Sequence, residues 1–331
     1  MTPSKPPAAL APAALAALAA LATVSALGCT DILGIEPGLA LCDATWAHWV
    51  PGSAQDYETT QDTALDPLTH LRWTRSPQAA MTHADASAAC EALSFDDEGS
   101  YRLPTRIELL SLLDYKLVVP IDTDTFLVDG SLPFWTSSFP VGKTLQLGPD
   151  EFLDTYVLTV ETSTGNVSSV DHNKPENLFQ SLCVRLDGLE VPSTTAAACP
   201  DRYTAEEGDT VYLDRETGLR WERTFGTNAE VPTLAEAEAR CAALPLAGGG
   251  WRLPTIAELQ TIVDESTKST SAYDPRFDGS NDYYWTSTTD AANPLQTWVV
   301  SFFNGEVHSF PTDGTGLNGA PAAPKSVRCV R

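Results

Sequence analysis

Arg102-Leu103-Pro104-Thr105 is the stretch of this chain that decides the fold, because the same four residues return as Arg252-Leu253-Pro254-Thr255. A glutamate follows each threonine by three residues, Glu108 in the first case and Glu258 in the second. Threonine and glutamate at this spacing form a capping box, in which each side chain binds the backbone N–H of the other residue at the first turn of a helix. The repeated stretch therefore predicts the N-terminus of a helix in each half of the chain.

Further landmarks surround both stretches in the same order, and we interpret the chain as two copies of one domain. Asp66 to Trp73 and Asp214 to Trp221 each have the pattern of a β-hairpin, with strand residues on both sides of a turn. The turn needs a residue with positive φ, and this position holds Gly218 in the second copy and His70 in the first. We interpret His70 as a strained turn residue rather than a metal ligand, because histidine adopts this conformation more often than most residues and no other histidine lies at ligand spacing.

Strands at both ends of each copy, with two helices between them, predict an α+β fold. Trp135 and Trp285 occupy matching strands, and we expect both in the core because large aromatic side chains dominate cores; a surface that stacks on sugar rings is the alternative. We expect Arg102 and Arg252 to brace the fold by pairing with an acid or with strand carbonyl groups, which suits the guanidinium geometry. Contact with a ligand is the alternative.

The cysteines predict a disulfide framework. Seven are present, and apart from Cys29 two of the remaining six occupy matching places in each copy. One lies in the first helix, whose N-cap is Thr82 or Thr233, and the other lies in the last strand. The predicted bridges are Cys90–Cys183, Cys241–Cys329 and, as the simplest pairing of the two cysteines that remain, Cys42–Cys199. Loop entropy gives each of the first two bridges about 4–5 kcal/mol.

The first 28 residues have the pattern of a secretory signal peptide. Lys5 provides a positive start, residues 8–27 are rich in alanine and leucine without charge, and Ser25-Ala26-Leu27-Gly28-Cys29 resembles the lipobox of bacterial lipoproteins. Ala26 stands where leucine is usual, and Leu27 stands where a small residue is usual. We expect cleavage before Cys29 and lipidation of this residue; an uncleaved transmembrane anchor is the alternative.

These patterns define the expected organisation of the chain. A signal peptide covers residues 1–28, a lipid-tethered segment 29–41, the two domains 42–187 and 199–331, and a linker 188–198. Each domain is long enough to bury its own core. Because disulfides need an oxidising compartment, we expect an exported, lipid-anchored protein of the bacterial cell envelope, at the outer membrane or the cell surface.

The net charge of −24 narrows the range of partners. A surface this acidic repels phosphate backbones and anionic lipid. Nucleic acid is therefore not expected as a partner, and the lipid anchor is the expected contact with a membrane. We interpret the charge as a means of solubility, with capture of cations by acidic side chains as the alternative.

Taken together, the motifs resemble the DUF1566 family of bacterial surface proteins, also called Lcl C-terminal-like domains. The second copy carries essentially the whole pattern, in the segments Asp214 to Trp221, Cys241, Trp251 to Leu259, Trp285 to Ser287, and Arg328 to Arg331. The first copy departs from it at His70, at Tyr101 and at Leu182, where the pattern has arginine. The resemblance extends to the formylglycine-generating enzymes and the C-type-lectin-like fold. It implies two tandem domains, each with two helices around a small, twisted, mainly antiparallel sheet and long irregular loops.

Catalysis is not expected, because the sequence contains no serine nucleophile motif and no histidine pair at metal-ligand spacing. An enzyme of the formylglycine-generating type would need reactive cysteines near the C-terminal part of its chain. Cys183 and Cys329 instead have matching helical partners and are expected in inert disulfides. No cofactor is expected.

One loop is the candidate ligand site. Carboxylate and amide oxygens alternate there with aromatic rings that offer stacking faces, and the residues are Tyr273, Asp274, Phe277, Asp278, Asn281, Asp282 and Tyr284. Because oxygen clusters suit Ca²⁺, a calcium site at Asp274, Asp278 and Asp282 is one interpretation, although no metal is otherwise expected. The alternative is a solvated acidic loop.

The sequence therefore predicts a non-catalytic binding or adhesion-type protein that recognises a glycan, or an envelope or extracellular partner, through the loops at 115–150 and 265–296. Some relatives bind sulfated polysaccharide, but the acidity of this chain argues against polyanions. Two other hypotheses stand beside this one: a structural envelope spacer without a small ligand, and a divergent enzyme of the formylglycine-generating type.

Overall fold

A computed structural model of the protein describes residues 56–95, 100–140, 155–187, 202–215, 217–223, 230–264, 272–274, 276–280, 282–316, 321 and 323–331. The expected signal peptide, the lipidated Cys29, the bridge Cys42–Cys199 and the linker at 188–198 lie outside these residues, so those predictions stay predictions. In the described part of the chain, no helix combines the length and the apolar character needed to cross a membrane.

Helices and strands are mixed in both domains, which confirms the α+β class. The elements of the first domain are β1 (Glu58–Thr59), β2 (Thr63–Asp66), β3 (Leu71–Thr74), β4 (Gln78–Met81), α2 (His83–Glu91), α3 (Arg106–Leu110), β5 (Phe134–Trp135), β6 (Tyr156–Val160), β7 (Val167–Asp171), β8 (Phe179–Ser181) and β9 (Val184–Leu186).

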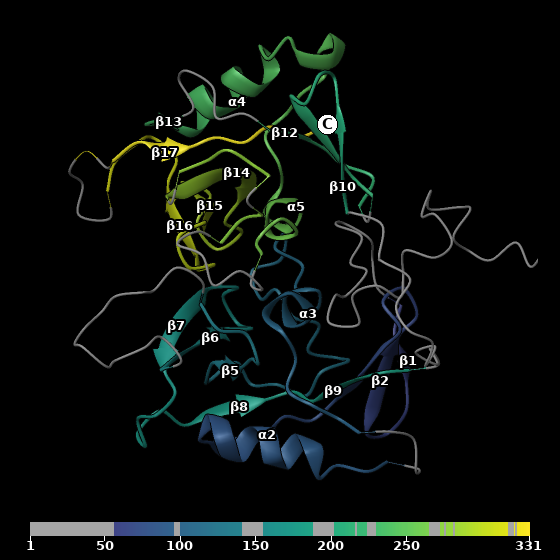
Figure 1. The fold of residues 1–331 in the computed structure, drawn as a ribbon. Coiled ribbons are helices and arrows are strands. Elements are labelled where there is room, and N and C mark those ends of the chain that lie inside the picture. Colours follow the sequence, from purple (N-terminus) through teal and green to yellow (C-terminus); the bar gives the residue numbers. More distant parts are fainter. Residues whose placement is uncertain are drawn as a thin grey trace, which may run out of the picture.

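The second domain repeats this order with small changes. Its elements are β10 (Tyr203–Glu206), β11 (Val211–Asp214), β12 (Arg220–Glu222), β13 (Glu230–Val231), α4 (Leu234–Ala242), the 3-10 helix η1 (Leu246–Gly248), α5 (Ile256–Gln260), β14 (Tyr283–Thr289), β15 (Gln296–Ser301), β16 (Val307–Pro311) and β17 (Lys325–Ser326). Figure 1 shows the two domains one above the other, with α2 and α4 at opposite ends of the molecule and α3 and α5 near its centre.

The predicted hairpins are confirmed. β2 pairs antiparallel with β3, and β11 with β12. His70 has a φ of 56° and Gly218 a φ of 72°, so both adopt the left-handed conformation that the turn requires. In β2 and β3 the inward-facing residues Ala64 and Trp73 are fully buried, which leaves the alternate residues, such as Arg72, on the opposite face of the sheet.

Side-chain caps begin the helices, and one of the caps differs from the others. Capping boxes are present at Thr105 and Thr255, and also at Thr233. At Thr82 the hydroxyl accepts from the backbone N–H of Asp85, but the Asp85 carboxylate accepts from the Thr82 hydroxyl instead of from its backbone. Aspartate is one methylene shorter than glutamate, so this helix carries only half of a capping box.

The two domains are joined in one sheet. Within the described residues its strand order is β13-β17-β14-β15-β16-β7-β6-β5-β8-β4, and the domains meet where Val167 of β7 pairs antiparallel with Val307 of β16. These valines hold matching positions, because Val167 pairs with Val160 of β6 and Val307 with Val300 of β15. The domains therefore meet about a local twofold axis, which covers two strand edges that would otherwise be open to association.

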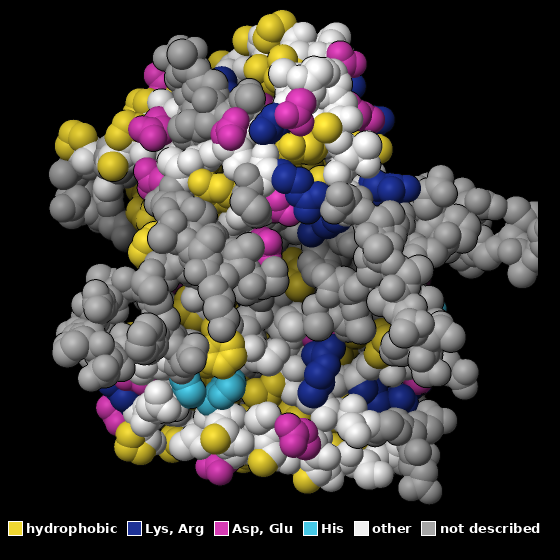
Figure 2. All heavy atoms as spheres, viewed as in Figure 1, with side chains coloured by type: hydrophobic (Ala, Val, Ile, Leu, Met, Phe, Trp, Pro, Cys, Tyr) yellow, Lys and Arg dark blue, Asp and Glu magenta, His cyan; other side chains and the backbone are white. Residues whose placement is uncertain are grey.

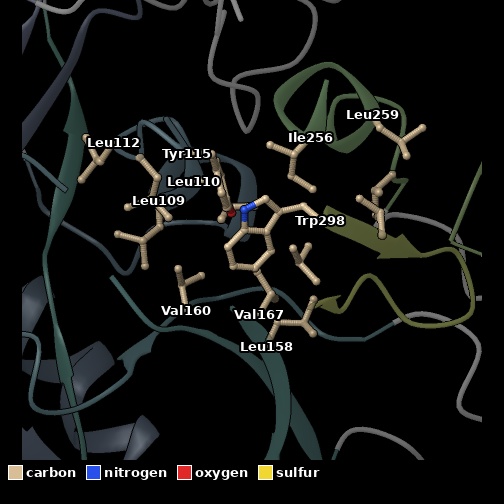
Figure 3. Packing of buried hydrophobic residues seen from close by; sticks show 14 of the residues in the cluster. Leu109, Leu110, Leu112, Tyr115, Leu158, Val160, Val167, Ile256, Leu259 and Trp298 are labelled. Carbon is tan, nitrogen blue, oxygen red and sulfur yellow. The ribbon is translucent and has the colours of Figure 1, made fainter. Parts of the chain in front are cut away.

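The largest apolar cluster also draws on both domains. Figure 3 shows Leu110 and Tyr115 from the first domain packed around Trp298, with Ile256 from the second domain beside them. Smaller clusters around Trp135 and Trp285 belong to one domain each. The expectation of two separate cores is therefore only partly right, because apolar residues of α3 and α5 belong to one cluster that spans the domain boundary.

A buried polar chain crosses the same boundary. The Arg106 Nη1 donates to Gln260 Oε1 at 2.9 Å, and the Gln260 Nε2 donates to the Tyr115 hydroxyl at 3.4 Å. The Tyr115 hydroxyl in turn donates to the carbonyl of Gly165 at 2.9 Å. Because buried polar groups are costly when they lack partners, this chain of hydrogen bonds selects one relative placement of the two domains.

Two of the predicted disulfides are confirmed. Cys90 of α2 is bonded to Cys183, and Cys241 of α4 is bonded to Cys329, with a Cα–Cα distance of 5.4 Å in both bridges. That distance lies within the range of ordinary disulfides. Cys183 directly precedes β9 and Cys329 follows β17, so each bridge ties a helix of its domain to the C-terminal segment of that domain.

Glu306 links the second domain to the first. Its carboxylate accepts from the backbone N–H of Ser169 at 3.1 Å and also from the Ser169 hydroxyl. Burial on its own would raise the pKa of Glu306, but hydrogen bonds from His308, Ser169 and Asn304 outweigh burial and lower the pKa to about 2. The ionised carboxylate therefore favours the docked arrangement.

Acid is expected to weaken this link. The pKa of Glu306 is about 2 in the folded state, below its ordinary value of 4.5, so its contribution is fully present above pH 4.5 and is lost as the pH falls toward 2. After allowance for solvent screening we expect about 1–2 kcal/mol. The measurement is the free energy of unfolding between pH 2 and 7: Glu306→Gln should flatten its pH dependence, and Glu176→Gln at an exposed turn should not. Equal slopes for wild type and Glu306→Gln would refute the assignment.

Candidate functional site

The repeated arginines are structural braces, as the sequence analysis expected. The Arg102 guanidinium donates to both carboxylate oxygens of Glu108, at 2.8 and 2.6 Å, and the backbone N–H of Thr105 donates to the same carboxylate at 2.7 Å. The backbone of Arg102 exchanges two hydrogen bonds of 2.9 Å with Val184. The motif therefore fastens the start of α3 to the terminal strand β9.

The second copy reproduces this geometry. Arg252 donates to the two carboxylate oxygens of Glu258 at 2.7 and 2.6 Å, and the Thr255 N–H donates at 2.8 Å. Burial opposes ionisation of Glu258, but the hydrogen bonds from Arg252 and Thr255 prevail and lower its pKa. Both glutamates are therefore engaged with the fold rather than available to a ligand.

Both tryptophans lie in the core, as expected. Trp135 and Trp285 are fully buried. Their indole N–H groups donate to the carbonyls of Met81 at 2.8 Å and Val231 at 3.1 Å. Neither ring can therefore serve as a surface for sugar stacking.

The expected ligand loop needs correction, because its aromatic faces are turned inward. Phe277 is 2% exposed and lies against the Tyr203 and Tyr212 rings. Tyr284 is fully buried, and its ring packs against Phe302 at a centroid distance of 4.7 Å. The sequence pattern does not distinguish aromatic residues that anchor a loop from aromatic residues that bind a ligand.

The acidic residues of that loop have separate local partners. Asp274 accepts three hydrogen bonds from Arg276, and Asp282 accepts from the backbone N–H of Tyr283 at 2.7 Å. Asp278 is exposed, and Tyr273 donates to the carbonyl of Gly279 at 2.9 Å. Asn281 lies outside the described residues. No group of three or more potential metal ligands of the His, Cys, Asp or Glu type occurs in the described part of the chain.

A cavity in the first domain, which the sequence analysis did not identify, is a better candidate. It has a volume of about 180 Å³ and opens on the outer face of the β2–β3–β9 sheet. Among the described residues, those that line it are Thr60, Asp62, Thr63, Arg72, Phe95, Tyr101 and Arg185. A space of this size holds a molecule of about one six-membered ring.

Two arginines from neighbouring strands contribute to the cavity wall. Arg72 and Arg185 are direct cross-strand partners in β3 and β9, an arrangement in which like charges repel. Asp187 lies between them: Arg72 Nε donates to its carboxylate at 2.6 Å, and Arg185 Nη1 lies 3.3 Å from its second oxygen. Arg72 also donates to the Thr63 hydroxyl at 3.2 Å.

Tyr101 lines the cavity and carries a buried hydroxyl. The residue is 1% exposed, and its Oη has no hydrogen-bond partner among the described residues. The Arg185 guanidinium lies 5.7 Å from the centre of the Tyr101 ring. In the second domain the matching residue, Trp251, donates its indole N–H to the Leu246 carbonyl at 2.7 Å. The polar group is therefore satisfied in the second domain and unsatisfied in the first.

The family of the chain follows from its sequence. The model of the Lcl C-terminal domain matches residues 62–185 and again residues 210–331. The chain belongs to the Lcl C-terminal domain family. No curated protein matches it. The two matched stretches contain both arginine–glutamate braces and both confirmed disulfides, so these features belong to both copies of the Lcl C-terminal domain.

The cavity lies where the first Lcl C-terminal domain departs from the motif of the second. Tyr101 replaces the tryptophan of the repeated pattern, and this departure is the one sequence signal that points to the cavity. The remaining wall residues come from β2, β3 and β9, whose side chains meet only through pairing between distant strands.

Removal of the Tyr101 hydroxyl gives a test in which the loss of a buried polar group should not lower stability. Tyr101→Phe should leave stability unchanged or raise it by up to about 1 kcal/mol, because a buried donor without a partner is removed. Tyr115→Phe, in which a buried hydroxyl loses its bond to Gly165, should lower stability by about 1–2 kcal/mol. Both are measured by guanidinium denaturation. A Tyr101→Phe protein destabilised as much as Tyr115→Phe would show that the Tyr101 hydroxyl is already satisfied.

Proposed function

We propose that this protein is an exported, lipid-anchored, non-catalytic binding protein of the bacterial cell envelope. In this proposal the first domain takes a polar group of a glycan, or of an envelope or extracellular partner, into the cavity beside Tyr101. The observation that carries the proposal is a hollow of about 180 Å³ that is lined by two arginines and by Tyr101, whose buried hydroxyl has no hydrogen-bond partner among the described residues. Concave sites with a few convergent polar groups are the usual form of ligand sites.

The state of the cysteines supports a non-catalytic role. Cys183 and Cys329 would be the candidates for a reactive thiol, and each is bonded to a helical cysteine. A disulfide sulfur carries no nucleophilic thiolate. We also propose that each domain is related to the C-type-lectin-like fold, which the two helices and mainly antiparallel strands support.

The loops at 115–150 and 265–296, which are expected to contact a partner, also take part in the proposed binding. Val118 is 62% exposed and Leu295 is 76% exposed, and Leu117, Val119 and Leu127 are exposed on the first of these loops. Apolar side chains on exposed loops are suited to contact with a larger partner. In this proposal the cavity would supply specificity and the loops would supply contact area.

A plug at the cavity rim tests the proposal. Asp62 is exposed at the rim, and Thr210 holds the matching position in the second domain. We expect Asp62→Trp to weaken binding in a glycan array and in envelope pull-down at least 10-fold because the ring blocks the entrance, whereas Thr210→Trp should bind as wild type does.

Two results would contradict the proposal. Ligands that bind wild type and Asp62→Trp equally well would place recognition elsewhere. A wild-type protein that binds nothing in either assay would favour the structural spacer.

A further inference from the structure

We infer that the apolar tip of the first loop, Leu117-Val118-Val119, contacts the lipid bilayer that holds the proposed lipid anchor. This inference rests on the proposed function, and it narrows the larger partner of this loop to a zwitterionic membrane surface. It follows from the exposure of the tip, from the support at its base, and from its distance to the place where the described chain begins.

Three consecutive apolar side chains are exposed at the tip. The exposed fractions are 52% for Leu117, 62% for Val118 and 47% for Val119. The other large apolar residues that are exposed in the described part of the chain, among them Leu127 and Leu295, stand singly. Single exposed apolar residues are ordinary, whereas a run of three on a surface indicates a contact.

The tip is supported by hydrogen bonds at its base. The backbone N–H of Asp114 donates to the carbonyl of Pro120 at 2.8 Å and closes the loop, and the N–H of Leu117 donates to the carbonyl of Asp114 at 3.0 Å. Next to the tip, Tyr115 is buried, and its hydroxyl donates to the carbonyl of Gly165 at 2.9 Å. Because these bonds already order the loop, contact with a surface costs little further conformational entropy.

The second domain has no apolar tip at the matching place. Leu113 and Ile121 form a β-bridge in the first domain, and Val263 and Tyr273 form the matching bridge in the second. Between the second pair, residues 265–271 read Glu-Ser-Thr-Lys-Ser-Thr-Ser in the sequence. The shared fold therefore does not require apolar residues at this tip, which favours a role in contact for those of the first domain.

The tip lies close to the residues where the described chain begins. In the proposed function the lipid is on Cys29, upstream of these residues. The ring of Tyr57 packs against Phe126 at a centroid distance of 5.1 Å, and the Phe126 N–H donates to the carbonyl of Asp122 at 2.9 Å. Val119 precedes Asp122 by three residues, and because an extended chain spans at most about 3.6 Å per residue, Val119 lies within about 20 Å of Phe126. The tip and the lipid-bearing segment can therefore meet the same membrane.

The charge around the tip selects a zwitterionic membrane surface. Asp114, Asp122 and Asp124 are exposed on the same loop, and Lys116 is the one basic residue between positions 114 and 124. On the face drawn in Figure 2, lysine and arginine side chains lie in a few small groups rather than in a continuous basic surface. Anionic lipid would therefore be repelled, whereas zwitterionic headgroups let the apolar tip approach while the acidic side chains stay hydrated.

The tip acts as a second contact beside the lipid anchor. Three aliphatic side chains bury too little apolar area to hold a protein of this size on a membrane alone, and stable attachment takes more than one weak element. In this inference the anchor holds the protein at the bilayer and the tip fixes the orientation of the first domain.

Photo-crosslinking in vesicles tests the contact. The full lipidated protein, with its disulfides intact, is reconstituted in phosphatidylcholine vesicles that contain a phospholipid with a diazirine in its acyl chain, and crosslinked peptides are mapped by mass spectrometry. We expect about 10-fold or more crosslinking in residues 114–127 than in the matched residues 264–273, because only the first loop brings apolar side chains to the acyl chains. Equal crosslinking of the two segments would overturn the inference.

Variants connect the crosslinking to the tip. Replacement of all three residues, as Leu117→Ser, Val118→Ser and Val119→Ser, should lower the yield in residues 114–127 about 10-fold, whereas replacement of the same three by isoleucine should preserve it. Both variants should unfold at the wild-type Tm, because these side chains are exposed. Addition of about 30% phosphatidylglycerol should lower the wild-type yield about 3-fold through charge repulsion. A serine variant that crosslinks as wild type does, or a yield that rises with phosphatidylglycerol, would contradict the inference.

The outcome for the membrane contact is distinguishable from the outcome for the function. If intact mass shows a lipid on Cys29 and Asp62→Trp abolishes ligand binding, but the tip does not crosslink, the membrane contact is wrong and the proposed function stands. If Cys29 carries no lipid, the proposed anchor and the membrane contact are both wrong. A serine variant that loses an envelope protein in pull-down, without lipid crosslinks in wild type, would assign the tip to that protein instead.

Discussion

The ion pair between Arg102 and Glu108, repeated by Arg252 and Glu258, is the interaction on which the rest of each domain depends. Glu108 is 1% exposed and accepts from the arginine through both oxygens while it also caps the helix. The same arginine pairs through its backbone with Val184, next to the disulfide at Cys183. Charge-assisted bidentate bonds of this kind are short and directional. One motif thus fixes the start of α3 and the terminal strand β9. It also fixes Tyr101, which directly precedes Arg102 and lines the cavity.

Because each domain is held together by the same contacts, residues around these contacts can differ between the two copies. The two copies keep the brace, the disulfide and the hairpin, yet they differ at Tyr101 and Trp251 and in the partners of their matching arginines. Function is carried by such sites rather than by the frame. The shared sheet and the shared apolar cluster place the two copies in one unit, so the second domain can act as a rigid support for the cavity of the first.

Local chemistry made much of this fold predictable. The caps at Thr105 and Thr255, the turn at His70 and the disulfides follow from short spacings or from matching the two copies. The cavity does not, because it depends on the register that brings Arg185 beside Arg72 across more than a hundred residues. The same limit explains the error over Phe277 and Tyr284, whose burial is set by tertiary packing that no local pattern encodes.

A double-mutant cycle on the first brace tests the central claim most directly. The free energy of unfolding would be measured for Arg102→Met, Glu108→Gln, the double variant and wild type. If the brace holds the domain together, the two changes are coupled by about 2 kcal/mol, since residues that share a hydrogen-bond network do not act additively. Additive losses, with coupling below about 0.5 kcal/mol, would show that the helix start and the terminal strand are held by other contacts and would contradict the account.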